Sequence, residues 1–212
     1  GFKAGQDLVA SNIQTVDAGS RFQVEGLLNG EFYISVLGEH QVKNTLNSML
    51  VGKALGLTDE QIRVALQRVT LTDMRMQLVQ TGDVLFINDA YNAAPTSMHA
   101  AIQFVQNTVM RAEKWLVLGD MLELGKDEKR FHEEIAQQID REKITRVCLF
   151  GPRMKWLYDK LQQSFEADKL VYTENDYEPI IETVKAFAGK ESLVLLKGSR
   201  GMKLETILKA LE

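Results

Sequence analysis

Asn-Asp-Ala-Tyr-Asn-Ala-Ala-Pro-Thr-Ser, residues 88–97, follows directly on the apolar run Val84–Ile87. The run is typical of a short buried strand, and the Pro-Thr-Ser opens a helical spacing of apolar residues. Polar side chains therefore follow a strand, at the edge where open α/β sheets bind ligands. The stretch predicts a strand–loop–helix unit with a ligand site in its loop.

The same alternation of strand and helix continues to the end of the chain. Apolar residues recur at helical spacing over 98–109, 131–139, 180–187 and 204–211. Between these stretches lie apolar runs of strand length, Trp115–Leu118, Val147–Phe150, Leu170–Tyr172 and Leu193–Leu196, and Met76–Val79 is a candidate edge strand. The pattern predicts an α/β fold, a mostly parallel sheet with helices on both faces.

Residues 1–37 are expected to be extended, with a β-hairpin in which two alternating apolar runs flank Leu27-Leu28-Asn29-Gly30. Asn-Gly is a strong hairpin signal because both residues tolerate positive φ. Two helices are expected next. Apolar residues from Val42 to Leu50 recur at helical spacing, and Thr58–Gln61 matches a capping box that opens the second helix.

The change of pattern predicts two domains, residues 1–72 and 73–212, with the boundary near Val69–Met74. The net charge of −4 and the pI of about 5.5 favour neither nucleic acid nor an anionic membrane as a partner. The single cysteine, Cys148, is expected in the core, and its isolation fits a reducing compartment such as the cytoplasm. Because the chain begins with Gly1 rather than Met, we expect a fragment of a longer protein.

Several common catalytic motifs are absent from the sequence. There is no Gly-x-x-x-x-Gly-Lys-[Ser/Thr] phosphate loop, no Gly-x-Gly-x-x-Gly fingerprint and no Gly-x-Ser-x-Gly elbow. His40, His99 and His132 show no zinc spacing, and His132 is expected to be an exposed helix residue. The sequence thus has the layout of a ligand-binding α/β domain without a phosphate loop of its own.

Four motifs together resemble the Mur ligase family. They are Gly38-x-His40-x-x-x-Asn44, Asp89-x-Tyr91-Asn92-Ala93-x-Pro95-x-Ser97, Leu118-Gly119-Asp120-Met121-Leu122-Glu123-Leu124-Gly125 and Leu196-Lys197-Gly198-Ser199-Arg200-Gly201-Met202. The resemblance covers essentially the whole chain. Gln41 and Ala94 depart from it, because the family often has Asn at both positions.

The resemblance implies the end of a central ATP-binding domain, a hairpin plus two helices, followed by a complete Rossmann-like C-terminal domain. It further implies a monomeric enzyme that uses ATP and Mg²⁺ to join D-alanyl-D-alanine to a UDP-N-acetylmuramoyl tripeptide through an acyl phosphate. The phosphate loop, the catalytic residues and the metal ligands would then lie outside this chain.

Six residues are candidates for nucleotide binding. The amide of Asn44 suits an adenine edge, and the carboxylate of Asp89 can accept both hydroxyls of a ribose. The alternatives are purely structural: Asn44 could hydrogen-bond only to backbone, and Asp89 could stabilise a turn or cap the following helix. Asn92 is the better candidate for the turn or cap. The resemblance adds His40, Tyr91 and Asn92, and it implies that Arg75 lies near the phosphates, against the alternative of a solvated surface side chain.

Five residues are candidates for holding the dipeptide. Asp120 or Glu123 could bind its ammonium, Lys197 or Arg200 could bind its carboxylate, and Ser199 could add an anion contact before the last helix. The alternatives are that Ser199 only caps the last helix and that the charged side chains are simply solvated at the surface.

The sequence is also compatible with other functions. A sister ligase that adds the third peptide residue usually carries Asp-Asn-Pro-Arg, which does not occur here. A folylpolyglutamate synthetase and a non-catalytic module that binds a small molecule are the further alternatives. The sequence upstream of Gly1 would distinguish an enzyme from a binding module.

Overall fold

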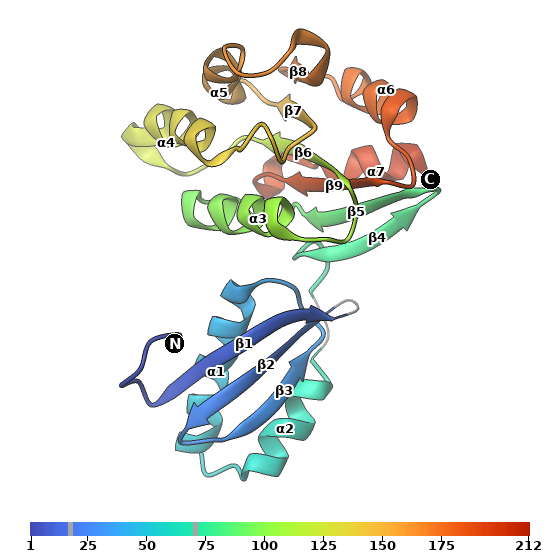
Figure 1. The fold of residues 1–212 in the computed structure, drawn as a ribbon. Coiled ribbons are helices and arrows are strands. Elements are labelled where there is room, and N and C mark those ends of the chain that lie inside the picture. The colour runs from blue at the N-terminus through green and yellow to red at the C-terminus, as the bar shows by residue number, and fades with distance from the viewer. Residues whose placement is uncertain (17–18, 70–71) are drawn as a thin grey trace. The chain divides into compact units, whose positions relative to one another are not determined.

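The computed structural model describes residues 1–16, 19–69 and 72–212. These residues form two compact units, Gly1–Thr72 and Asp73–Glu212, shown in Figure 1. Residues 70 and 71, in the predicted boundary segment, lie outside the described residues.

The first unit is a three-stranded antiparallel sheet covered by two helices. Its elements are β1 (Leu8–Val16), β2 (Gly19–Gly26), β3 (Gly30–Ile34), α1 (Glu39–Ala54) and α2 (Asp59–Gln67). The strands lie in the order β1-β2-β3, so the predicted hairpin is present but gains a third strand. Inward residues such as Phe22 and Phe32 pack on Leu46 and Ile62 of the helices, which gives the unit a core of its own.

The loop of this hairpin lies within the predicted stretch Leu27–Gly30. Gly26 and Gly30 take positive φ angles of 128° and 125°, and Leu27, Leu28 and Asn29 connect them. The side chain of Asn29 accepts a hydrogen bond from the Gly26 N–H (3.2 Å) and donates one to its carbonyl (3.0 Å). Of the predicted Asn29-Gly30 pair only Gly30 takes a positive φ, because the Asn29 side chain closes the loop instead, and Leu28 is buried in the core.

The second unit is a six-stranded sheet of order β4-β5-β9-β6-β7-β8. All strand pairs are parallel except β4 with β5, so the predicted edge strand is antiparallel. The strands are β4 (Gln77–Thr81), β5 (Val84–Asp89), β6 (Glu113–Gly119), β7 (Arg146–Phe150), β8 (Leu170–Thr173) and β9 (Ser192–Lys197). The helices are α3 (Pro95–Asn107), α4 (Glu128–Glu134), α5 (Met154–Leu161), α6 (Glu178–Phe187) and α7 (Glu205–Leu211), with short 3₁₀ turns at Gly125–Asp127, Ile135–Gln138, Ala167–Lys169 and Arg200–Met202.

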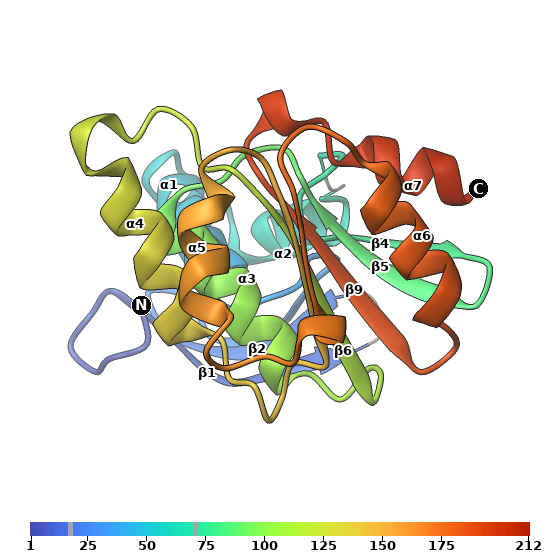
Figure 2. The same ribbon diagram turned by 90° about the horizontal axis from the view of Figure 1, so that it is seen from above.

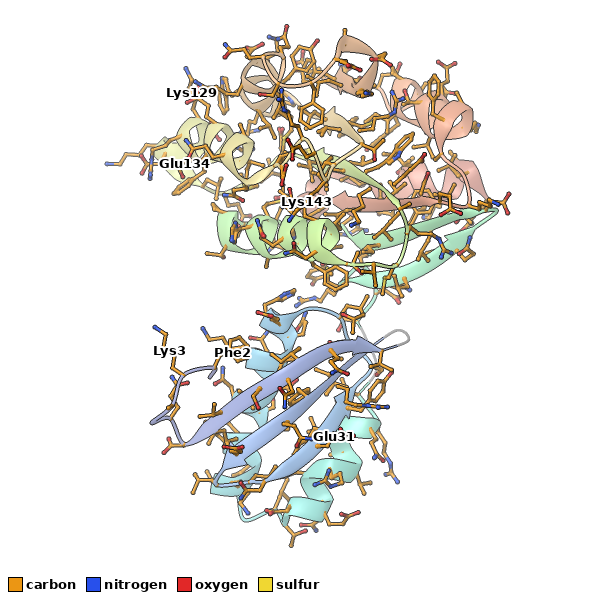
Figure 3. The ribbon with its side chains drawn as sticks, in the orientation of Figure 1. Phe2, Lys3, Glu31, Lys129, Glu134 and Lys143 are labelled. Carbon is orange, nitrogen blue, oxygen red and sulfur yellow. The ribbon has the colours of Figure 1, made fainter. Side chains whose placement is uncertain are left out.

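Helices cover both faces of this sheet. The helices α3, α4 and α5 lie on one side and α6 and α7 on the other, as Figure 1 and Figure 2 show. Trp115, Val117 and Cys148 pack with α6 and α7, and Cys148 is buried as predicted. The predicted α/β class is confirmed. Among the described residues, no helix has the length and apolar character needed to cross a bilayer.

Two details of the helix prediction were wrong. The α5 helix was missed because only eight residues carry its pattern. The predicted helix over 98–109 extends too far at its carboxyl end, since α3 ends at Asn107 and Val109 is 96% exposed.

Candidate functional site

The predicted site loops follow β5, β6 and β9, which are neighbours in the sheet. Because these strands are parallel, their carboxyl ends meet at one edge. The loops after β6 and β9 pack backbone against backbone, since a Cβ added at Gly198 would lie 3.0 Å from the Cα of Gly119. A side chain at Gly198 would therefore collide with the backbone of the neighbouring loop, and one at Gly119 would crowd the side chains of Met202 and Leu204.

Asp89 and Lys197 form an ion pair at this edge. They face each other in the β5–β9 register, and the Lys197 Nζ lies 2.5 Å from Asp89 Oδ2. The same Nζ donates to the Asn92 carbonyl at 3.1 Å, and the lysine side chain is only 2% exposed. Lys197 therefore holds Asp89 and its loop, and it presents no free ammonium to a substrate carboxylate in this conformation.

The other oxygen of Asp89 holds the segment where the chain enters the second unit. Asp89 Oδ1 accepts a hydrogen bond from the Met76 N–H at 3.0 Å. Met74 and Met76 take left-handed φ angles of 60° and 51°, and the Tyr91 N–H donates to the Met74 carbonyl at 3.1 Å. Between them, the Arg75 guanidinium lies 4.5 Å from the centroid of the Tyr91 ring. Arg75 and Tyr91 are both exposed at the surface of the second unit.

The local helix-cap role falls to neither Asp89 nor Asn92. Asn92 accepts a hydrogen bond from the next residue, Ala93, at 2.9 Å. The first turn of α3 is closed by Ser97, whose hydroxyl accepts from the Ala94 N–H at 3.1 Å. Asn92 thus remains exposed beside Asp89 and Tyr91.

His40 and Asn44 lie on α1 in the first unit. Asn44 is exposed, and its amide donates to Gln41 Oε1 at 3.2 Å. His40 is half-buried against the start of the helix, where a Cβ added at Gly38 would lie 2.8 Å from the imidazole. Gly38 has a φ of 95°, so its lack of a side chain lets the chain enter α1 beside the ring.

Asp120 caps a helix rather than facing the edge. Its carboxylate accepts hydrogen bonds from the N–H groups of Arg153 (3.3 Å) and Met154 (2.9 Å) at the start of α5. Burial raises the pKa of Asp120, whereas these N–H groups and the Arg153 guanidinium at 3.5 Å oppose the rise. Asp120 is fully buried, so it has no exposed oxygen for the predicted contact with an ammonium group.

His132 is fully buried, so the prediction of an exposed residue was wrong. Its Nε2 accepts a hydrogen bond from the Met121 N–H at 3.0 Å, and its Nδ1 lies 2.7 Å from the Glu128 carbonyl. Trp156 of α5 packs on the ring edge-on. The sequence carried a signal for this position, because His132 precedes Ile135 by three residues and Ile139 by seven, which is the spacing of one helix face.

Ser199, Glu123 and Arg200 complete the edge. The Ser199 hydroxyl accepts from the Leu122 N–H at 2.8 Å, and the Ser199 N–H donates to the Asp120 carbonyl at 3.0 Å. Ser199 therefore joins the two loops. Glu123 is exposed with a left-handed φ of 64°, and Arg200 is half-exposed and paired with Glu205 at 2.5 Å. Of the five predicted dipeptide residues, Glu123 and Arg200 are the two with exposed charge.

Comparison with known proteins identifies the class. The family model described as Mur ligase, glutamate ligase domain, matches residues 74–200. The chain therefore belongs to the Mur ligase family.

Individual relatives are more specific. The chain is 39% identical over 207 residues to the UDP-N-acetylmuramoyl-tripeptide–D-alanyl-D-alanine ligase of Bacillus subtilis, covering 97% of this chain and 45% of that protein. The Haemophilus influenzae ligase of the same name is 31% identical, with 98% and 45% covered. A crystal structure of MurF from Acinetobacter baumannii superposes with a TM-score of 0.85 at 25% identity, covering 99% of this chain and 45% of that one. The chain thus spans about half the length of these relatives.

Proposed function

We propose that this chain acts as part of an ATP-dependent ligase that adds D-alanyl-D-alanine to a UDP-N-acetylmuramoyl tripeptide. The observation that carries the proposal is the meeting of three motif-bearing loops, after β5, β6 and β9, at one edge of the sheet. The names of the similar relatives support the same reaction. In this proposal residues 1–72 end an ATP-binding domain and residues 73–212 supply a substrate-binding domain.

The nucleotide part of the proposal centres on Asp89. Its carboxylate is 14% exposed and is held rigidly by Lys197 and the Met76 N–H, which suits a fixed acceptor for ribose hydroxyls. Arg75 lies beside it, stacked on Tyr91, and its charge suits nucleotide phosphates. Asn44 and His40 are proposed to contact the nucleotide from α1. A solved relative that contains ADP supports nucleotide use within this fold.

The dipeptide part rests on exposed charge at the loops after β6 and β9. Glu123 is proposed to bind the ammonium and Arg200 the carboxylate, because an Arg can bind a carboxylate with two parallel hydrogen bonds. Lys197, Ser199 and Asp120 support these loops from beneath. Glu123 would hold the dipeptide ammonium in place, and one of its protons passes to solvent. The free amine then attacks the carbonyl carbon of the acyl phosphate: the amide C–N bond forms, the C–O bond to the phosphate breaks, phosphate leaves and a second proton passes from the nitrogen to solvent.

Magnesium, which the resemblance implies, is proposed to bind to residues outside this chain. Over residues 1–16, 19–69 and 72–212, no group of three His, Cys, Asp or Glu side chains is placed to hold a metal ion.

A substrate panel tests the proposal. The ligase that contains this chain is supplied with ATP, UDP-N-acetylmuramoyl tripeptide and one acceptor at a time, and the product is identified by mass spectrometry. We expect a pentapeptide product only with D-alanyl-D-alanine. The 212-residue chain by itself should release no ADP above a heat-inactivated control. Extension by a single amino acid, or of a folate by glutamate, would refute the proposal in favour of another ligase.

A further inference from the structure

Three consecutive amides fix the loop after β6. The N–H groups of Asp120, Met121 and Leu122 donate to the Phe150 carbonyl (3.3 Å), His132 Nε2 (3.0 Å) and Ser199 Oγ (2.8 Å). The acceptors come from β7, from α4 and from the loop after β9. The backbone of the loop is thus held from three directions. The chain then turns at Glu123, which has a positive φ, and continues into the 3₁₀ turn at Gly125–Asp127.

The hydrogen bonds of His132 determine its protonation state. Because Nε2 accepts from the Met121 N–H, it carries no hydrogen, and the one ring proton must lie on Nδ1 and point at the Glu128 carbonyl. A proton added to Nε2 would face the Met121 N–H, donor against donor. The bond to Met121 therefore exists only while His132 is neutral.

We propose that neutral His132 is a positioning residue for the dipeptide site. It holds the Met121 amide, so that Glu123 faces the ligand, and protonation of the ring breaks this one of the three hydrogen bonds that fix the loop. The inference rests on the proposed function for the identity of the ligand. Its structural part, the bond between imidazole and Met121, stands independently. Glu123 makes the contact with the ligand, and His132 acts on it through the loop.

Charged groups face the ring from each neighbouring element. Asp120, in the loop after β6, and Glu128, on α4 itself, favour the protonated ring. Arg153, before α5, opposes it and forms an ion pair with Glu128 at 2.6 Å. Burial is the largest effect and lowers the pKa of His132 below its ordinary value of 6.5. The Met121 amide is thus held at neutral pH and is released by acid.

Nuclear magnetic resonance of the labelled 212-residue chain tests the structural part. At pH 7.5 we expect the neutral tautomer of His132 with its proton on Nδ1. On acidification the protection of the Met121 amide against hydrogen exchange should fall about tenfold, which is the effect of losing one hydrogen bond. His132→Gln keeps a neutral acceptor and should retain protection at both pH values, whereas His132→Leu should lose it at both. His99→Leu, at an exposed histidine of α3, is the control. A proton on Nε2 at pH 7.5, or protection that ignores pH in the wild type, would overturn the proposal.

Kinetics of the ligase containing this chain test the functional part. His132→Leu should raise KM for D-alanyl-D-alanine about tenfold and leave KM for ATP unchanged, and His132→Gln should restore the dipeptide KM without the acid-side rise seen in wild type. Equal changes in both constants would mean a general packing role and would overturn the positioning role. If the wild-type ligase does not use the dipeptide, the proposed function fails, and the Met121 measurement alone decides whether His132 holds the loop.

Discussion

The residues at the sheet edge divide into those that can touch a ligand and those that hold them. Lys197 was predicted from its motif as a ligand contact, yet its ammonium is buried on Asp89 and the Asn92 carbonyl. Asp120 likewise caps α5. Sequence motifs find such positions because both roles need a polar side chain at a strand end. Motifs cannot separate contact with a ligand from support of a loop, because the burial of the side chain depends on which other loop packs over it.

Asp89→Ala should destabilise the second unit. The substitution leaves the Lys197 ammonium buried without its partner, which typically costs about 3–5 kcal/mol. The double variant Asp89→Ala/Lys197→Met should recover most of the loss, because it removes the orphaned charge as well. Urea unfolding followed by tryptophan fluorescence measures both. Equal stability of the single variant and wild type would show that the ion pair is not buried in solution.

The buried imidazole of His132 should make folding weaker in acid. Its pKa is lowered in the folded chain, so as pH falls below about 6.5 the unfolded chain takes up the proton first and stability declines until the folded pKa is passed. The slope is at most about 1.4 kcal/mol per pH unit. Asp120, whose pKa is raised, acts in the opposite sense at lower pH. Comparing wild type with His132→Gln from pH 7.5 to 5.5 isolates the histidine, and parallel stability curves would contradict its buried neutral state.

At the scale of elements, α5 and its preceding turn depend on a carboxylate from the loop after β6, which is distant in sequence. Gly151 has a φ of 115°, and a Cβ there would lie 2.5 Å from Asp120 Oδ1. No local pattern reveals this, since Asp120 and α5 are joined only when β6 and β7 pair. The long apolar strands and α3 were predictable because their patterns are local. The short α5, the end of α3 and the Asn29 loop were not.

Gly151→Ala should therefore cost about 2 kcal/mol or more, from left-handed strain and displacement of the Asp120 carboxylate. Gly189→Ala is the matched control, because a Cβ at that glycine meets nothing within 4 Å. Urea unfolding of both variants provides the measurement. A Gly151→Ala loss no larger than that of Gly189→Ala would mean that the turn can rearrange without cost.

At the scale of the whole molecule, the two units should unfold separately. The first unit buries a smaller core and leaves apolar side chains such as Leu55 (77% exposed) and Val51 (59%) on its surface. Smaller units bury a smaller fraction of their surface and are less stable. Both tryptophans, Trp115 and Trp156, lie in the second unit, so fluorescence reports that unit alone. Circular dichroism should show a transition at lower urea concentration, from unfolding of the first unit, and this transition should be absent from the fluorescence curve. Coincident transitions would mean one cooperative unit.

The central claim is that the edge formed by the loops after β5, β6 and β9 binds the ligands, and mapping of amide chemical shifts tests it most directly. Titration of the labelled chain with D-alanyl-D-alanine should shift amides of residues 119–125 and 198–202, with smaller shifts from L-alanyl-L-alanine, and ADP should shift residues 74–76 and 89–92. A groove of about 340 Å³ lies at the opposite edge, lined by residues that include Arg141, Phe165 and Lys169. Shifts confined to that groove, or the same response to both dipeptides, would contradict the account.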